Sequence, residues 1–304
     1  MPFVKHARRR KSGKIMLTVT LAIVAVIFII PLVLSLADSF MSEQEISDNY
    51  GMVTSGAQSG SGENNQDVAE SEGFANMKFI PDIVTLSQYY TVLIKRLQFL
   101  IMFWNSARLV IPIIAGQVFI ASMAAYAFAK LKFPGRDKLF FLYIIVMLMP
   151  FQVTLVPNYI IADKLALIGS RLSIILPGIF GTFGVFLLRQ FMQYIPDEYL
   201  ESAKVDGASQ GSIFFKIILP MTKAGLAALA ILLFIDNWNM VEQPVIFLQD
   251  VNLQPLSIYL SSINSGERGI AFAASSIYMA PMILCFLYWE SYLIEGIQLS
   301  GLKG

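Results

Sequence analysis

The sequence predicts an all-α, polytopic membrane protein with six transmembrane helices, and three observations carry this prediction. Of the 304 residues, 56% are hydrophobic and only 14% are charged, which is outside the usual range of soluble domains. Six apolar stretches are each about 20 residues long, the length that crosses the hydrocarbon core as a helix. Lysine and arginine are also concentrated in every second segment between these stretches, which places most of them on one side of the membrane, as in membrane proteins of fixed orientation.

The six apolar stretches divide the chain into a tail, a first helix, a loop and a core. We expect the spans at Ile15–Leu36, Arg108–Phe128, Leu139–Val156, Leu172–Phe191, Gly225–Leu248 and Ile270–Ile294. The apolar residues Leu97–Phe103 follow Lys95 and Arg96, which favours a short interfacial helix leading into the second span over an extra span. The expected parts are a basic N-terminus (1–14), the first helix (15–36), an external loop (37–103), a five-helix core (104–294) and a C-terminal tail (295–304).

The distribution of bases orients this bundle in the cell membrane. Six bases precede the first span with no acid among them, and further bases follow the second span and border the loop after the fourth. Because short cytoplasmic loops are rich in lysine and arginine, both termini and the loop at 196–221 are predicted to be cytoplasmic.

The external loop contains an acidic, low-complexity insertion at 38–77. It carries eight acids and no base, with serine, glycine, asparagine and glutamine between them. This composition favours a flexible, solvated loop, and docking of a basic partner surface is the alternative.

Residue types that most catalytic and metal sites need are scarce. The chain has one cysteine, Cys285, and one histidine, His6. An intrachain disulfide is therefore impossible, and metal sites and His-assisted nucleophilic catalysis are disfavoured. Ser12-Gly13-Lys14-Ile15 lacks the spacing and hydroxyl of a phosphate-binding loop. We expect no catalytic, cofactor-binding or metal-binding residue on this chain, and no enzymatic activity.

The loop at 196–221 is predicted to form two short helices. Asp197 can cap a first helix over Glu198–Ala208, and Ser209 can cap a second one that carries Ile213, Phe214, Ile217 and Ile218. Leu200, Ala203 and Gly207 share one narrow face at spacings of three and four. We expect that face to seat in a partner's cleft and Gly207 to be intolerant of bulk; an amphipathic elbow at the membrane surface is the alternative.

Several residues of this loop follow one another at fixed spacings. Glu201-Ser202-Ala203 is followed by Gly207 after three residues, by Ile217 after nine more, and then by Leu219-Pro220. This spacing resembles the EAA loop of ABC import permeases, with Ser202 in place of the first alanine of that pattern. The resemblance implies a type I ABC importer permease-like bundle with a cytoplasmic coupling helix. The residues it implies for ATPase coupling are Leu200, Glu201, Ser202, Ala203, Gly207, Ile217, Leu219 and Pro220.

Further segments resemble the carbohydrate branch of these permeases, of the maltose-importer type, from Phe79 to the C-terminus. They are Phe79-Ile80-Pro81, Asn105-Ser106, Asp250-Val251-Asn252 and the ending Gly301-Leu302-Lys303-Gly304. The resemblance implies a second homologous permease, two ATPase subunits that bind ATP and Mg²⁺, and an external solute-binding protein. It also implies ATPase contacts of the tail at Gly301, Lys303 and Gly304, and binding-protein contacts at Asn264, Ser265, Gly266 and Glu267. A sugar or oligosaccharide is the expected solute, with glycerol phosphate as the alternative.

A polar cluster in the fifth predicted span has two interpretations. Asp236-Asn237-Trp238-Asn239 would be costly to bury without partners. The cluster either lines the substrate path, offering hydrogen bonds and an aromatic face to a sugar, or holds helices together by hydrogen bonds. A secondary transporter is the rival class for the whole chain, but deep ionisable relays and paired interrupted helices are not evident.

Overall fold

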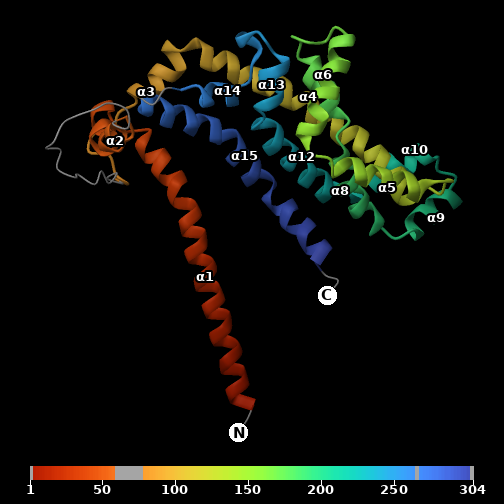
Figure 1. Ribbon diagram of the computed structural model, residues 1–304. Helices are drawn as coiled ribbons and strands as arrows, with labels where there is room; N and C mark the ends of the chain where they lie inside the picture. The colour runs from red at the N-terminus through yellow and green to blue at the C-terminus, as the bar shows by residue number, and fades with distance from the viewer. Residues whose placement is uncertain (1–2, 59–77, 264–266, 302–304) are drawn as a thin grey trace. The chain divides into compact units, whose positions relative to one another are not determined.

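The computed structural model describes the backbone of residues 3–58, 78–263 and 267–301, and every regular element in these ranges is helical. The all-α prediction is therefore confirmed. The chain forms two compact units: the first comprises residues 1–97 and 263–277, and the second comprises residues 98–262 and 278–304. Figure 1 labels most of the helices of both units.

The first unit begins with α1 (Phe3–Asp38), followed by α2 (Glu43–Gln58), α3 (Ser87–Tyr90) and the π-helix η1 (Thr91–Lys95), and includes the start of α15 (Arg268–Gly301). Residues Lys14–Asp38 of α1 are long and apolar enough to cross a membrane, and none of their most apolar window is buried within the chain. The first predicted span is thus confirmed as an apolar helix of suitable length. Its side chains are left to contact lipid or another protein.

The expectation of a flexible loop at 38–77 is wrong for residues 43–58, which form α2. Ile46 on this helix is buried, and the Tyr50 hydroxyl donates to Oδ2 of Asp38 over 2.6 Å. The Tyr50 ring lies 5.9 Å from that of Phe272, and Arg268 donates to the Tyr50 carbonyl over 2.7 Å. Apolar burial and these bonds order the helix although its composition is polar and acidic. Residues 59–77 lie outside the described part of the chain.

The second unit is built around α4 (Leu97–Lys130), one continuous helix of 34 residues. It contains the predicted second span, but the separate interfacial helix expected at 97–103 is wrong because these residues form the first turns of α4 itself. The buried side of α4 includes Leu109, Ile113 and Ala121. This side packs into the apolar cores of the second unit.

The third predicted span is broken instead of continuous. Helices α5 (Arg136–Met147) and α6 (Phe151–Lys164) meet at 99°. Pro150, at the break, has an extended ψ of 140°. Proline disfavours the helical conformation of the residue before it and has no N–H for the helical ladder, which explains the end of α5.

The fourth predicted span is present as α7 (Leu172–Ile179) and α8 (Thr182–Gln193), which together satisfy the length and composition of one membrane helix. The fifth is shorter than expected: α12 (Lys223–Trp238) ends before Asn239, and α13 (Glu242–Phe247) is separate. The connection then continues through η3 (Val251–Leu253) and α14 (Leu256–Ser261) to α15. The continuous helix expected at 225–248 is therefore wrong beyond Trp238.

In the described ranges, four helices are long and apolar enough to cross a membrane alone, and up to six spans result if each bent pair counts as one. The prediction of six spans agrees with the upper number only as a count, because the bent pair that includes α12 takes in Gln210–Met221, which precedes the fifth predicted span. The sixth prediction, 270–294, coincides with the candidate span Arg268–Tyr292 of α15.

Candidate functional site

The loop that carries the spaced motif joins α8 to α12 and consists of four short helices. These are α9 (Glu198–Val205), α10 (Gln210–Ile213), the π-helix η2 (Phe214–Ile218) and α11 (Leu219–Met221). In Figure 1, α9 and α10 lie at the same end of the second unit as α5. Ser209 caps α10 as predicted: its hydroxyl accepts from the Ser212 N–H over 3.3 Å, and its backbone is extended. We call residues 196–221 the motif loop.

Asp197 does not cap α9 as predicted. Its backbone is already helical, and its Oδ1 accepts a hydrogen bond of 2.6 Å from Nζ of Lys130, the last residue of α4. Lys130 also donates to the Ile195 carbonyl, and its side chain is only 4% exposed, whereas that of Asp197 is 73% exposed. The hydrogen bond from Lys130 lowers the pKa of Asp197 below its ordinary value, with further help from the charges of Lys130, Lys132 and Lys204.

The face of α9 expected to enter a partner's cleft is used by the chain itself. Leu200 and Ala203 are buried in an apolar core that also contains Leu188, Ile213 and Ile218. The expectation of a free face formed by Leu200, Ala203 and Gly207 is therefore wrong for the first two residues. Their spacing of three places them on one side of the helix, but that side belongs to the same apolar core as residues of α8 and η2.

A second attachment fixes the other half of the motif loop to α4. The ring of Tyr126 lies 5.3 Å from that of Phe214, and its hydroxyl donates to Oε1 of Gln210 over 2.8 Å. Together with Lys130 at the end of α4, this contact links both halves of the motif loop to one long helix. The loop is thus held by packing and polar contacts and should follow movements of α4.

Outside the side formed by Leu200 and Ala203, α9 is open to solvent. Tyr199, Glu201, Ser202 and Val205 are exposed, and Val205 is 88% exposed. An exposed aromatic and an exposed valine beside acidic side chains form a small mixed surface. Such a surface suits docking on another protein better than an all-polar helix does. We call these four residues the outer face of α9.

Gly207 ends α9 in a left-handed conformation, with φ of +77°. Its N–H donates to the Lys204 carbonyl over 3.0 Å, and the next N–H, of Ala208, donates to the Ala203 carbonyl over 2.9 Å. A Cβ at position 207 would meet no atom of the chain within 4 Å. Within this chain, therefore, backbone conformation and not crowding calls for glycine here.

The last motif residues shape the turn into α12. Ile217 and Leu219 are half-buried against the same core as Leu200, and Pro220 is exposed. The segment Gln210–Met221 meets α12 at 73°. Glu201 and Ser202 are exposed on α9, so the motif divides into residues that pack inward and residues that face outward.

The polar cluster at the end of α12 is joined to α15. Trp238 is 2% exposed, and its ring packs against Phe103, Phe234 and Tyr278 at centroid distances of 5.6, 5.1 and 5.9 Å. Its Nε1 donates to the Tyr278 carbonyl over 3.2 Å, and the Tyr278 hydroxyl donates to the Trp238 carbonyl and to Oδ1 of Asn239. This geometry favours the interpretation that Trp238 holds helices together.

The amides of the cluster are also satisfied locally. The side chains of Asn237 and Asn239 donate to the carbonyls of Leu233 and Ile235, over 2.8 and 2.7 Å. Asp236 is exposed. Asn239 is exposed as well, but its side chain is bonded to Ile235 and Tyr278, so Asp236 is the exposed member of the four without a hydrogen bond to the described residues.

In the segment expected to contact a binding protein, the structure describes Glu267 but not Asn264, Ser265 and Gly266, which lie outside the described residues. Arg96 donates to Glu267 through both terminal guanidinium nitrogens, Nη1 and Nη2, with 3.0 Å between Nη1 and Oε2. This pairing lowers the pKa of Glu267. Gly301 ends α15, and Lys303 and Gly304 lie outside the described residues.

Sequence reasoning missed Lys130 and Arg96 as anchors of these segments. Each stands at the end of a helical element, but a partner 67 or 171 residues away is not readable from a single sequence. Among the described residues, no group of three or more histidine, cysteine or carboxylate side chains could hold a metal ion.

Residues 95–297 match the family described as binding-protein-dependent transport system inner membrane component. The arabinooligosaccharides transport system permease protein AraQ of Halalkalibacterium halodurans is 31% identical over 74% of this chain and 82% of that protein. The sn-glycerol-3-phosphate transport system permease protein UgpE of Salmonella typhi is 34% identical over 66% of this chain and 73% of that protein. A solved bacterial ABC transporter involved in alginate import contains a chain of the same fold, with a TM-score of 0.74, 20% identity, and coverage of 94% of this chain and 98% of that chain.

Proposed function

The chain belongs to the family of binding-protein-dependent transport system inner membrane components, and on that premise we propose that it couples ATP hydrolysis on partner subunits to import of a sugar or oligosaccharide. It is a membrane permease of an ABC transporter and acts in transport.

The observation that carries the proposal is the two-sided character of α9. Its inner side, Leu200 and Ala203, is part of the core, and its outer face is exposed. A partner that displaces the outer face would move a packed unit and not a loose loop, because packed cores transmit displacement. The motif loop therefore has the mechanical properties that a coupling element needs.

We assign the outer face to an ATPase subunit in the cytoplasm. The full transporter would comprise this chain, a second homologous permease, two ATPase subunits that hold ATP and Mg²⁺, and an external solute-binding protein. Closure of the ATPase pair on ATP would draw together the coupling helices of the two permeases. The translocation cavity between the permeases would then open to the outside, and ATP hydrolysis would return the transporter to its inward-facing state. Both termini are cytoplasmic in this arrangement, with six spans, following the distribution of bases.

A neutral sugar fits the open polar group of the α12 cluster better than a phosphate does. Asp236 is exposed, and the only base of α12 is Lys223, at its first residue. A carboxylate without a nearby base on its helix repels a phosphate ester and can accept hydrogen bonds from sugar hydroxyls. Glycerol phosphate remains the second candidate because a glycerol-3-phosphate permease is among the relatives.

The test is uptake by proteoliposomes that contain the complete complex. ATP is supplied on the side of the membrane that carries the ATPase subunits, and the solute-binding protein with bound solute is supplied on the opposite side. Uptake of labelled arabinooligosaccharides is compared with uptake of labelled sn-glycerol 3-phosphate. We expect ATP-dependent and binding-protein-dependent oligosaccharide uptake. Uptake of glycerol phosphate alone would contradict the substrate class. Uptake driven by a proton gradient without ATP would place the complex among secondary transporters.

A further inference from the structure

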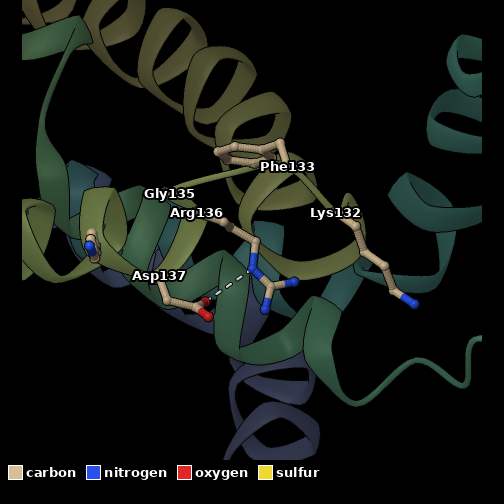
Figure 2. Close-up of a pocket in the computed structure, with 6 residues that line it drawn as sticks. Lys132, Phe133, Gly135, Arg136 and Asp137 are labelled. Atoms are coloured by element: carbon tan, nitrogen blue, oxygen red, sulfur yellow. Dashed lines mark hydrogen bonds and ion pairs between the residues drawn. The ribbon is translucent and has the colours of Figure 1, made fainter.

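The loop that joins α4 to α5 contains a hollow that the transport role does not use. Its volume is about 460 Å³. The residues that line it are Lys132, Phe133, Gly135, Arg136, Asp137 and Lys138. Three of these side chains are bases and one is an acid, so the lining carries net positive charge. Figure 2 shows the Arg136 guanidinium turned towards the Asp137 carboxylate.

The positive charge of the hollow is only partly neutralised by the chain. Nε of Arg136 donates to Oδ1 of Asp137 over 3.0 Å, and Nη1 donates to the Leu131 carbonyl over 3.4 Å, which positions the guanidinium. Lys132 and Lys138 are exposed and form no ion pair with any residue in the described ranges. An anion in the hollow would be attracted by the three lining bases and repelled by the lining carboxylate of Asp137 and, beside Lys132, by that of Asp197.

The backbone around the hollow also favours an anion. Gly135 has φ of +81° and turns the chain so that α5, a helix of 12 residues, begins at Arg136. The first turn of a helix presents N–H groups without intrahelical acceptors and the positive end of the helix dipole. The Phe133 ring forms an apolar wall and is itself held 6.0 Å from the ring of Phe128.

An apolar stripe continues from the hollow along α5. Phe141, Leu142 and Ile145 are exposed and lie three, four and seven residues after Lys138, on one face of the helix. The hollow also lies directly after α4, which has the length and composition of a membrane span. A ligand with an anionic head and long apolar chains matches this surface, whereas a small soluble phosphate would use only the head site.

We propose that this hollow binds the phosphate of an anionic phospholipid, whose acyl chains lie along the Phe141, Leu142 and Ile145 stripe. Clusters of lysine and arginine at the cytoplasmic ends of membrane helices bind such headgroups electrostatically. The proposal requires α4 and α5 to be in the membrane and does not depend on the solute or on the direction of transport.

The test uses the purified complete complex in detergent, with lipid binding measured by native mass spectrometry. Phosphatidylglycerol is compared with phosphatidylcholine for the wild type, the K132A/R136A/K138A variant and a matched variant, K95A/R108A/K164A. The matched variant removes the same charge from exposed bases elsewhere. We expect the wild type to prefer phosphatidylglycerol and the first variant to bind it about a hundredfold more weakly, at roughly fivefold per base. The matched variant should retain the wild-type affinity.

Two further arms separate the alternatives. If soluble sn-glycerol 3-phosphate displaced phosphatidylglycerol at similar concentrations, the hollow would be a soluble-phosphate site and the lipid assignment would be overturned. Unchanged lipid binding by K132A/R136A/K138A, together with loss of its ATPase subunits, would instead assign the bases to a protein contact.

The wild-type complex provides a test that does not depend on the assembly of any variant. Its preference for phosphatidylglycerol must weaken when the salt concentration is raised to about 0.5 M, because salt screens exposed charges. A wild-type complex without preference, or with a preference insensitive to salt, would overturn the proposal.

Discussion

Nζ of Lys130, at the end of α4, lies 2.6 Å from Oδ1 of Asp197, the residue before α9. The same ammonium group donates to the carbonyl of Ile195. One side chain from the second candidate span thus holds the chain entering the motif loop at two points. Since Leu200 and Ala203 attach α9 to the core on its inner side, the start of the motif loop is fixed by both polar and apolar contacts.

Lys130→Met should loosen the start of the motif loop. The change removes both hydrogen bonds of Lys130 and leaves the Ile195 carbonyl without this donor, at a cost of about 1.5 kcal/mol or more, which corresponds to about tenfold. Hydrogen exchange of the α9 amides in the purified complex should therefore accelerate by about tenfold, and uptake should fall. Lys164→Met, which alters an exposed base elsewhere, is the control. Equal exchange in both variants would show that Lys130 does not anchor the loop.

The ion pair between Asp197 and Lys130 predicts that the stability of the motif loop depends on pH only in the acidic range. Its pKa in the folded state lies below the ordinary value of 3.8, chiefly because of the hydrogen bond from Lys130. The pairing therefore stabilises the loop fully above that value and is lost as the pH falls through the lower, folded-state pKa. Protection factors of α9 should be constant from about pH 5 to 8 and decrease below about pH 4. Asp197→Asn should remove this acid step, and an identical step in the variant would refute the assignment.

Substitutions of Gly207 distinguish an effect of backbone strain from an effect of crowding by a partner. Because φ is +77° and a Cβ at this position would have no neighbouring atom within 4 Å, Ala and Leu should be destabilising to a similar degree, by about 1–2 kcal/mol. Asn should be milder, since it tolerates the left-handed conformation. The measurement is thermal stability of the purified permease and retention of the ATPase subunits for the three variants. A tolerated Gly207→Ala beside a severe Gly207→Leu would instead indicate a tight partner socket.

Tyr278→Phe tests whether the α12 cluster is structural. The change deletes the hydroxyl that donates to the Trp238 carbonyl and to Oδ1 of Asn239, over 2.9 and 2.8 Å. We expect a loss of about 1–2 kcal/mol in stability with an unchanged KM for the solute. Asp236→Asn, at the exposed member of the cluster whose side chain makes no hydrogen bond to the described residues, is expected to raise KM and to leave stability unchanged. The reverse pattern would place the aromatic cluster in the substrate path.

The sequence predicted the helices that are defined by their own length and apolar content. It did not predict the helix ends and breaks that depend on packing against other helices. Ile15–Leu36 and Leu172–Phe191 were predictable because length and apolar content alone define them. The break at Pro150 and the end of α12 at Trp238 were missed, because proline is often tolerated within membrane helices and interhelical contacts decide where the chain turns.

The motif loop shows the same division. Spacing located α9 and the cap at Ser209, because caps and helical periodicity are local properties. Which face of α9 is buried depends on α8 and η2, which are brought to it by the fold. For that reason the inner face formed by Leu200 and Ala203 was mistaken for the docking face.

The central claim is that the outer face of α9 docks on an ATPase subunit. The most direct measurement is photo-crosslinking in membranes of the assembled complex, with a photoreactive amino acid at Val205, which is 88% exposed. The matched control carries it at Val251, which is 55% exposed in η3 and assigned to the opposite side of the membrane. The account predicts a crosslink from position 205 to the ATPase subunit and none from position 251. A complex that assembles normally but yields no ATPase crosslink from position 205, or yields one from position 251, would contradict it.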